Sequence, residues 1–301
     1  MYPAPFKYYR AGSILDAAQL LTELGEEAKI LAGGQSLIPL MKLRLSRPAA
    51  LIDINFVSGL SGIEQVDDKL HFGALARHAA IESSRLVERV PILHDCAAGI
   101  ADIQVRNRGT IGGSVAEADP SGDWTTVLST LDCEIVCTGP AGERTIPISQ
   151  FVRDAYTTAL EPAELVRKVL VKIPPKNSGG AYVAFKRSAP VYATASAAVQ
   201  LIMEDRDICK DARISLGCVG LTAIRATEAE ATLRAQKVVP KIIESACEAA
   251  MAAAEPQSDM RGSADYKRRL VGALTKRALA TALARCRGER TEVSHEYIGR
   301  A

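Results

Sequence analysis

The chain has 301 residues, 48% hydrophobic and 24% charged, as in a soluble globular protein of two or three domains. Its 37 basic and 35 acidic residues give a net charge of +2, which offers no electrostatic reason to expect a nucleic acid or an anionic membrane as partner. The N-terminus has no apolar signal segment, and no run reaches the ~18 apolar residues of a membrane span. We therefore expect a cytoplasmic protein.

The first 56 residues predict a strand–helix–strand unit preceded by a helix. Residues 13–25 have helical spacing of apolar residues, with Ser13 as the N-cap and Gly25 at the end. Residues 28–34 predict a short buried strand, 36–46 a helix with Pro39 in its first turn, and 50–54 a second strand.

The next segment, residues 62–174, is predicted to contain a hairpin, helices, a long loop and further strands. Residues 62–75 predict a hairpin that turns at Asp67–Asp68, followed by helices over 78–90 and 91–102. Residues 103–123 are polar and glycine-rich, so we expect a long loop there. A helix over 124–132 and strands over 133–139, 143–149 and 163–174 complete the segment.

The run "PPKNSGG" at 174–180 is the clearest boundary signal in the chain. Three candidate strands follow, at 181–188, 195–204 and 212–220, and then three candidate helices, at 228–235, 240–254 and 265–286. Strands followed by helices predict a separate small α+β domain with an antiparallel sheet. We therefore divide the chain into a first domain at 1–176 (subdomains about 1–56 and 57–176), a second at 177–288, and a tail at 289–301.

The cysteines and histidines give no metal or disulfide pattern. Seven dispersed cysteines without a C-x-x-C spacing favour a reduced compartment over a disulfide framework. Cys133 and Cys137 alternate along one predicted strand, where we expect core positions. The four histidines are dispersed too, so we expect neither an iron–sulfur cluster nor another metal on this chain.

Two glycine pairs, each followed by serine, are candidate anion sites. Glycine lets backbone N–H groups converge on an anion, and a helix is predicted directly after the first pair. Each pair alone also fits an ordinary turn; two in one domain suggest a diphosphate held from both sides. Neither the Rossmann G-x-G-x-x-G nor the P-loop motif is present. The first glycine segment is Ala32, Gly33, Gly34, Gln35 and Ser36, and the second is Thr110, Ile111, Gly112, Gly113 and Ser114.

The stretches "LAGGQSLIPLMKLR" and "QVRNRGTIGGSVAEADPSGDW" closely resemble the FAD-binding medium subunits of molybdenum hydroxylases, the family of carbon monoxide and xanthine dehydrogenases. The starts of the chain and of its second domain, and the segment from 265, resemble this family too. The resemblance implies an α+β fold: a two-part FAD-binding domain of the vanillyl-alcohol-oxidase (PCMH) type, then a small α+β domain with a three-stranded antiparallel sheet and helices.

The resemblance also implies a set of cofactor contacts. Both glycine segments would hold the FAD pyrophosphate, Asp123 would contact the cofactor, Lys186 would lie close to the isoalloxazine ring and Tyr192 beside it. Without the resemblance, Asp123 would be a first-turn acid, Lys186 a solvated strand-end charge and Tyr192 an ordinary aromatic. Arg106 and Arg108, which flank the second segment, fit either phosphate steering or a solvent-facing or intersubunit role.

Two departures from the family pattern stand beside these contacts. Gln35 replaces a frequent histidine, and Glu117 stands where a histidine often precedes Ala-Asp. Both residues keep hydrogen-bonding capacity, so we expect FAD binding with an altered flavin potential or subunit docking.

Since no histidine or cysteine lies inside the glycine segments, we expect non-covalent FAD. Valine at Gly33 or Gly112 is expected to abolish FAD retention and leave the fold largely intact.

The family resemblance implies an oxidoreductase subunit that works inside a complex. A small iron–sulfur subunit would deliver electrons from a large molybdopterin subunit to FAD, which passes them to a quinone, NAD or another acceptor, in a dimer of heterotrimers. The chain itself shows no acid/base or nucleophile constellation, so no catalytic residue is predicted. Two alternatives stay open: a self-contained flavin-dependent reductase or oxidase of a small molecule, and a non-enzymatic nucleotide-binding module.

Overall fold

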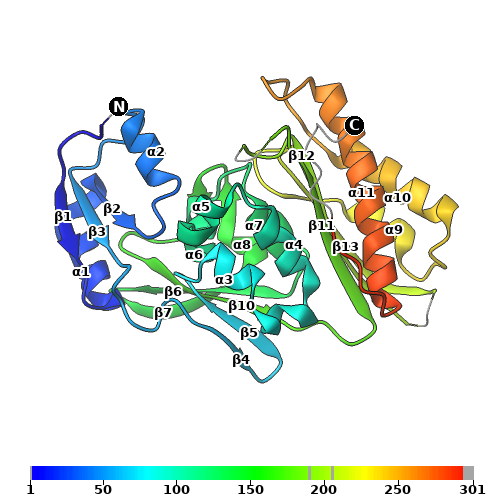
Figure 1. The fold of residues 1–301 in the computed structure, drawn as a ribbon, viewed down its shortest axis with the longest axis horizontal. Helices are drawn as coiled ribbons and strands as arrows, with labels where there is room; N and C mark the ends of the chain where they lie inside the picture. The colour runs from blue at the N-terminus through cyan, green and yellow to red at the C-terminus, as the bar shows by residue number, and fades with distance from the viewer. Residues whose placement is uncertain (1, 189–190, 205–206, 294–301) are drawn as a thin grey trace.

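The computed structural model describes residues 2–188, 191–204 and 207–293. These residues form β-sheets of three, five and four strands and a small fourth sheet of two strands. Figure 1 shows the N-terminal sheet at one end, a central sheet with a group of short helices, and a C-terminal sheet with long helices at the other end. Residues 294–301 of the predicted tail, including His295, lie outside the described residues. The domain limits at 176, 177 and 288 stay predictions.

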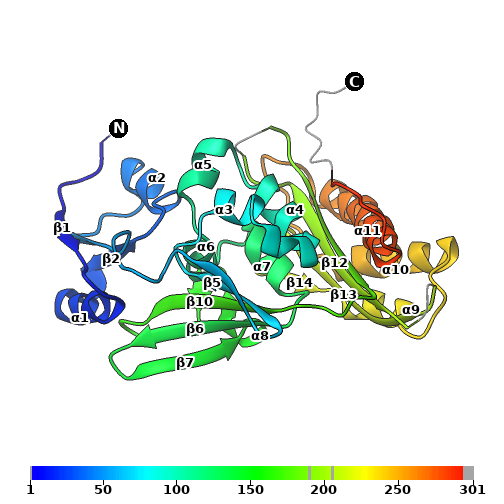
Figure 2. The ribbon, with the colours of Figure 1, turned by 60° about the horizontal axis from the view of Figure 1, so that its bottom comes forward.

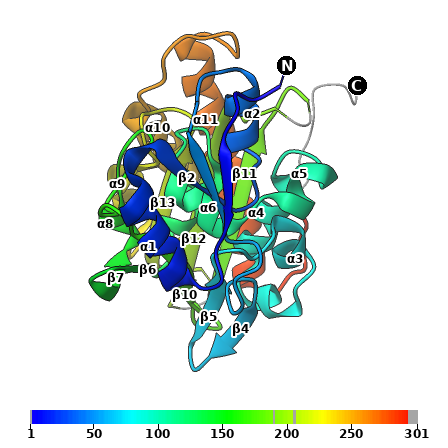
Figure 3. The same cartoon turned by 90° about the vertical axis from the view of Figure 1, so that its left-hand side faces the viewer.

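The N-terminal unit is a parallel sheet in the order β1-β3-β2 with one helix packed on it (Figure 3). Its helix α1 is capped as predicted: Ser13 Oγ accepts from Asp16 N at 3.0 Å, and Gly25 ends the helix with φ +64°. Strand β1 was not predicted, because its sequence KYYR is largely exposed and has no apolar alternation. The elements are β1 (Lys7–Arg10), α1 (Ile14–Leu24), η1 (Gly25–Glu27), β2 (Ala28–Leu31), α2 (Leu37–Lys42) and β3 (Ala50–Asp53).

The central sheet is antiparallel, in the order β4-β5-β10-β6-β7 (Figure 2). The predicted hairpin is confirmed, with Asp67 at φ +52° in its turn. Cys133 and Cys137 lie in the hydrophobic core, as predicted. The elements are β4 (Ile63–Val66), β5 (Lys69–Gly73), β6 (Cys133–Gly139), β7 (Gly142–Pro147), α8 (Ile148–Phe151), β8 (Val152–Asp154), β9 (Thr157–Thr158) and β10 (Leu165–Lys172).

Short helices pack above the central sheet, and here the sequence prediction of a loop over 103–123 is wrong. That stretch holds two capped helices: Asp102 Oδ1 accepts from Val105 N at 2.8 Å, and Thr110 Oγ1 accepts from Gly113 N at 3.1 Å. The predicted helix over 78–90 is two short pieces. The elements are α3 (His78–Glu82), η2 (Arg85–Arg89), α4 (Pro91–Gly99), α5 (Ile103–Arg108), α6 (Ile111–Glu117) and α7 (Asp123–Leu128).

The C-terminal sheet is antiparallel, in the order β11-β12-β13-β14, so a two-residue strand adds to the three predicted. The glycine pair of the predicted linker lies inside β11: a Cβ at Gly179 would come 2.1 Å from Ala282 O, so glycine lets helix α11 approach the strand. The elements are β11 (Ser178–Phe185), β12 (Ala195–Met203), β13 (Cys209–Gly217), β14 (Ile224–Arg225), α9 (Thr227–Leu233), α10 (Pro240–Ala253) and α11 (Ala264–Cys286).

Both faces of the C-terminal sheet are covered, which explains its near-continuous apolar strands. Along β11, Tyr182 and Ala184 belong to the core shared with the central helices, whereas Ala181 and Val183 belong to the core under α9, α10 and α11. The central helices α4 and α7 contact this sheet from the first face. The two parts of the chain are therefore joined through a buried apolar layer.

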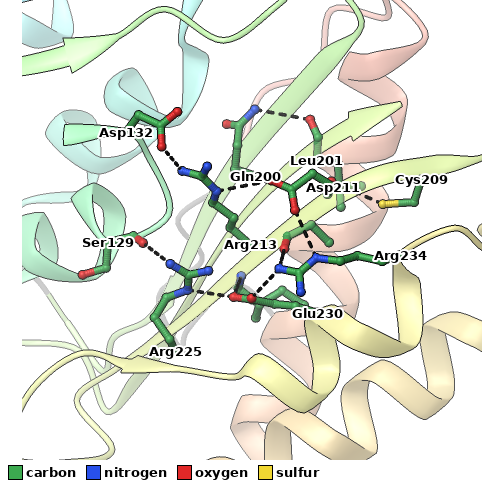
Figure 4. A network of polar contacts seen from close by, with 12 residues as sticks. Ser129, Asp132, Gln200, Leu201, Cys209, Asp211, Arg213, Arg225, Glu230 and Arg234 are labelled. Carbon is green, nitrogen blue, oxygen red and sulfur yellow. Dashed lines mark hydrogen bonds and ion pairs between the residues drawn. The ribbon is translucent and has the colours of Figure 1, made fainter. Parts of the chain in front are cut away.

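Polar contacts also tie the C-terminal sheet to the segment that follows α7 (Figure 4). Arg213 donates to Asp132 Oδ1 at 2.5 Å, and Arg225 donates to the Ser129 carbonyl at 2.9 Å. Glu230 is 1% exposed and accepts from Arg225, Arg234 and the Ile214 N–H, so these groups are held in one arrangement. Helix α7 is thereby fixed at its C-terminal end, while its first residue, Asp123, faces a cavity.

Candidate functional site

A cavity of about 600 Å³ lies where the N-terminal unit, helices α5 to α7 and the β11–β12 connection meet. Its volume is in the range of roughly 300–1,000 Å³ found for small-molecule and cofactor sites. Both glycine segments contribute to its wall, and so do Asp123, Lys186 and Tyr192. The predicted residues that line it are Ala32, Gly33, Gly34, Gln35, Ser36, Thr110, Gly113, Ser114, Asp123, Lys186 and Tyr192.

The first glycine segment lies against the turn that precedes the second. A Cβ built on Gly33 would come 2.3 Å from Arg108 O and 2.8 Å from Gly109 Cα. These distances are too short for any side chain to fit at this position. Gly34 has φ +72°, a left-handed conformation that favours glycine. The side-chain amide of Gln35 donates through Nε2 to the Gly33 carbonyl at 3.2 Å. Glycine is therefore required here by backbone packing at Gly33 and by the left-handed conformation of Gly34.

The second glycine segment divides its residues between the core and the cavity. Ile111 and Gly112 are not among the residues that line the cavity, so their assignment as cofactor contacts stays a prediction. Ile111 is fully buried, and a Cβ on Gly112 would come 2.6 Å from Ala74 Cα. Gly113 lies on the cavity side, where its Cβ would meet Thr110 Oγ1 at 2.7 Å and then Ala32 Cβ at 3.9 Å.

A buried ion pair forms another part of the wall. Lys186 is 2% exposed and Asp123 7%, and Lys186 Nζ lies 3.5 Å from Asp123 Oδ2. The ammonium also donates to Gly99 O at 2.6 Å, and Tyr182 OH donates to Asp123 Oδ1 at 2.5 Å. Burial, with Asp123 next, raises the pKa of Tyr182 well above its usual value, so it stays a donor. Lys186 is thus a fixed buried cation, and the alternative of a solvated strand-end charge is wrong.

His78 lines the cavity as well and was not predicted. Its Nδ1 accepts from the indole Nε1–H of Trp124 at 3.1 Å. Burial lowers the pKa of His78 to about 4, with Arg77 and Arg106 acting in the same direction and Asp123 opposing them. Since indole can only donate, the neutral imidazole carries its proton on Nε2. Nothing in the sequence around His78 distinguishes it from a structural histidine.

The unfolding free energy should depend on pH through His78. The folded pKa of His78, about 4, lies below the usual histidine pKa of 6.5, so the unfolded chain takes up a proton first as the pH falls. Stability present above pH 6.5 is lost toward pH 4, by about 3 kcal/mol in total. Urea denaturation across this range should show the loss in the wild type. His78→Gln, which keeps an acceptor for Trp124, should show a flatter profile; parallel profiles would contradict the assignment.

An acidic and aromatic group borders the outer part of the cavity. Tyr192 is 45% exposed, and burial together with the Asp119 carboxylate raises the pKa values of the Tyr192 and Tyr156 hydroxyls. Glu117 interacts with Ser36 of the first glycine segment, and burial raises the pKa of the Glu117 carboxyl. Glu117 and Asp119 stand in the motif already singled out, so the sequence could have indicated them. Tyr156 arrives from the β8–β9 turn, with no local signal.

The flanking arginines stay outside the cavity wall. Arg106 pairs with Glu82 at 3.0 Å and donates to Ile100 O at 3.1 Å, which holds α5 against its neighbours. Arg108 presents its carbonyl to Gly33 and to the Arg77 guanidinium.

Over the described residues there is no group of three or more histidine, cysteine, aspartate or glutamate side chains that could hold a metal ion. Nor do the described helices include one long and apolar enough to cross a membrane.

Two family models together match most of the chain. The one described as "FAD binding domain in molybdopterin dehydrogenase" matches residues 4–176, and the one described as "CO dehydrogenase flavoprotein C-terminal domain" matches 180–282. Among curated proteins, subunit alpha of the 6-hydroxypseudooxynicotine dehydrogenase complex of Paenarthrobacter nicotinovorans is 39% identical, over 98% of this chain and 100% of the relative.

Solved structures agree with these matches. Carbon monoxide dehydrogenase from Hydrogenophaga pseudoflava contains a chain that is 40% identical, with a TM-score of 0.92 over 95% of this chain and 100% of that one. Quinoline 2-oxidoreductase from Pseudomonas putida 86 contains one that is 33% identical, with a TM-score of 0.90 over 95% and 99% of the two chains. The predicted fold, a PCMH-type FAD-binding domain followed by a small α+β domain, is confirmed.

Proposed function

This chain belongs to the family of FAD-binding medium subunits of molybdenum hydroxylases. We propose that its cavity of about 600 Å³ is the FAD site. We also propose that the bound FAD passes its electrons to a quinone, NAD or a similar external acceptor. The chain is an FAD-dependent electron-transfer subunit of an oxidoreductase complex. The single observation that carries the site assignment is that both glycine segments meet on one cavity wall.

The residues of the inner wall fit a dinucleotide diphosphate. Gly33, Gly34 and Gly113 line the cavity without side chains, so ligand oxygens could approach their backbone closely. The hydroxyls of Ser36 and Ser114 are further donors on the same wall. We assign the FAD pyrophosphate to the space between the two glycine segments, held without a covalent bond.

The wall formed by Asp123, Lys186 and Tyr192 fits the flavin ring. Bound FAD supplies the redox chemistry, since flavin accepts electrons singly from clusters and can release two together. The buried Lys186 ammonium, oriented by Asp123 and the Gly99 carbonyl, would stabilise the negative charge of the reduced ring. The Tyr192 side chain would cover one edge or face of the ring and limit access to it.

Lys186→Met should make the flavin midpoint potential more negative. The variant removes the buried cation and leaves the negative charge of Asp123 without its partner. Both effects disfavour the negatively charged reduced flavin. A charged hydrogen bond of about 1.5–3 kcal/mol corresponds to roughly 60–130 mV for one electron. Spectroelectrochemical titration would measure the shift. Lys172→Met, at a side chain 54% exposed, should leave the potential unchanged; equal potentials in all three proteins would contradict the role of Lys186.

We also assign partners to this subunit. Its relatives include medium chains of carbon monoxide dehydrogenases, and no ligand group for a metal is found in the described part of this chain. Electrons would therefore reach FAD from another protein, which we propose to be a small iron–sulfur subunit fed by a large molybdopterin subunit. We propose a dimer of heterotrimers as the assembly.

The experiment that tests this function is co-expression of the chain with its two partners. Heat or acid should release one FAD per chain, and a substrate of the large subunit should reduce that flavin. A purified complex without flavin would overturn the proposal. Reduction of the isolated chain by NADH or a small substrate, with no partner present, would instead support the self-contained reductase.

A further inference from the structure

The loop between α10 and α11 is held rigidly, and one of its side chains reaches the segments around the cavity. Lys267 is 4% exposed, donates to Gln257 O at 2.8 Å and pairs with Asp259 at 2.9 Å. Asp259 Oδ1 in turn accepts from Arg261 N at 2.8 Å, and Asp259 and Gly262 form a backbone bridge. The backbone at Arg261 therefore has a defined position in this loop.

The Arg261 guanidinium joins two segments that are far apart in sequence. Its Nη1 donates to Ser121 Oγ at 3.0 Å and to Ala193 O at 3.1 Å. Its Cζ lies 5.8 Å from the centroid of the Tyr192 ring, within cation–π range. One side chain of the C-terminal domain thus contacts the residue beside Tyr192 and the tyrosine ring itself.

Both segments carry wall residues of the cavity. Ser121 directly precedes Gly122 and Asp123, and Ala193 directly follows Val191 and Tyr192. Tyr192 is half exposed, so packing alone immobilises it less than a core side chain. Arg261 restrains the ring and the backbone carbonyl that follows it. The guanidinium suits this double task, because its Nη1 group donates both hydrogen bonds while its delocalised charge lies over the Tyr192 ring.

We propose that Arg261 is a positioning residue that holds Tyr192 against the flavin. The inference rests on the FAD site proposed above and adds a residue from the other domain to it. Without the arginine, the FAD diphosphate contacts are unchanged, but the tyrosine swings away from the ring. The flavin then becomes more exposed, its fluorescence is quenched less by the phenol, and it leaves the site faster.

The test compares Arg261→Met, Arg261→Lys and Arg268→Met in the co-expressed complex. Arg268 is an exposed arginine of α11 that pairs with Asp265 and serves as the matched control. Arg261→Met should keep FAD bound after purification, show brighter flavin emission and release FAD roughly tenfold faster. Lysine should restore part of the effect, since it keeps the charge and loses the fork. Arg268→Met should match the wild type.

A double variant separates positioning from general loosening. In a Tyr192→Ala background, Arg261→Met should add less than about a twofold change, because the two residues act through one contact. Wild-type emission and release in Arg261→Met would overturn the proposal, and so would an undiminished effect in the Tyr192→Ala background. Complete loss of FAD from Arg261→Met, not restored by lysine, would also overturn it. A wild-type complex without FAD would overturn the proposed function instead.

Discussion

Valine at position 113 should leave the chain folded and without FAD. Gly113 lies on the cavity side of α6, where the first contact of an added Cβ is the Thr110 hydroxyl, a group that can rotate away. The loss of that helix cap costs only about 1 kcal/mol. The valine methyls would occupy space that we assign to the pyrophosphate, which should weaken FAD binding by about 3 kcal/mol or more, at least a hundredfold. FAD content and urea denaturation of the purified protein measure the two effects.

Two other glycines are the controls for this experiment. Gly62 has open space around an added Cβ, so Gly62→Val should retain FAD. Gly112→Val should behave differently from what the sequence indicated: its Cβ would come 2.6 Å from Ala74, so overpacking would destabilise the fold itself by about 1–3 kcal/mol. A Gly113→Val protein with the FAD content of the wild type would contradict the position of the diphosphate.

Alanine at position 123 should cause the largest loss of stability among these variants. The Lys186 ammonium would keep the Gly99 carbonyl but lose its counter-charge, and the Tyr182 hydroxyl would lose its acceptor. Breaking a buried pair by removing one partner costs about 3–5 kcal/mol. Urea denaturation followed by the fluorescence of the single tryptophan, Trp124, would report the change, and the purified protein should lack FAD.

Surface and isosteric variants define what this result means. Asp132→Ala removes a side chain that is 60% exposed and leaves Arg213 paired with Asp211, so it should cost at most about 1 kcal/mol. Asp123→Asn keeps an acceptor for Tyr182 but removes the charge. Its loss of unfolding free energy should lie between the losses of Asp123→Ala and Asp132→Ala. If Asp123→Ala were no less stable than Asp132→Ala, the Lys186–Asp123 pair would not be the buried structural element described above.

Local pattern predicted much of the fold, and it failed where glycines serve tertiary packing. Helix α1 is indicated by its caps and spacing, and the β4–β5 hairpin by its turn. Residues 103–123 look like a loop because four glycines and many polar residues interrupt any apolar period. In the structure Gly112 presses on Ala74, a contact between distant parts of the chain, so the reason for the glycine is invisible locally.

The candidate site could be predicted only in part, for a related reason. The glycine segments stand out as motifs, whereas the arrangement around Lys186 joins Gly99, Asp123 and Tyr182 from three different elements. Only the family resemblance pointed to Asp123, Lys186 and Tyr192. Arg261 and His78 carry no motif at all, because their positions depend on which loops and helices the fold brings together.

A structure of the purified complex with FAD bound would test the central claim most directly. We predict the pyrophosphate between Gly33–Ser36 and Gly113–Ser114, with the isoalloxazine ring beside Lys186 and Tyr192. An FAD molecule held elsewhere on the chain, or a pyrophosphate away from both glycine segments, would contradict the site assigned here.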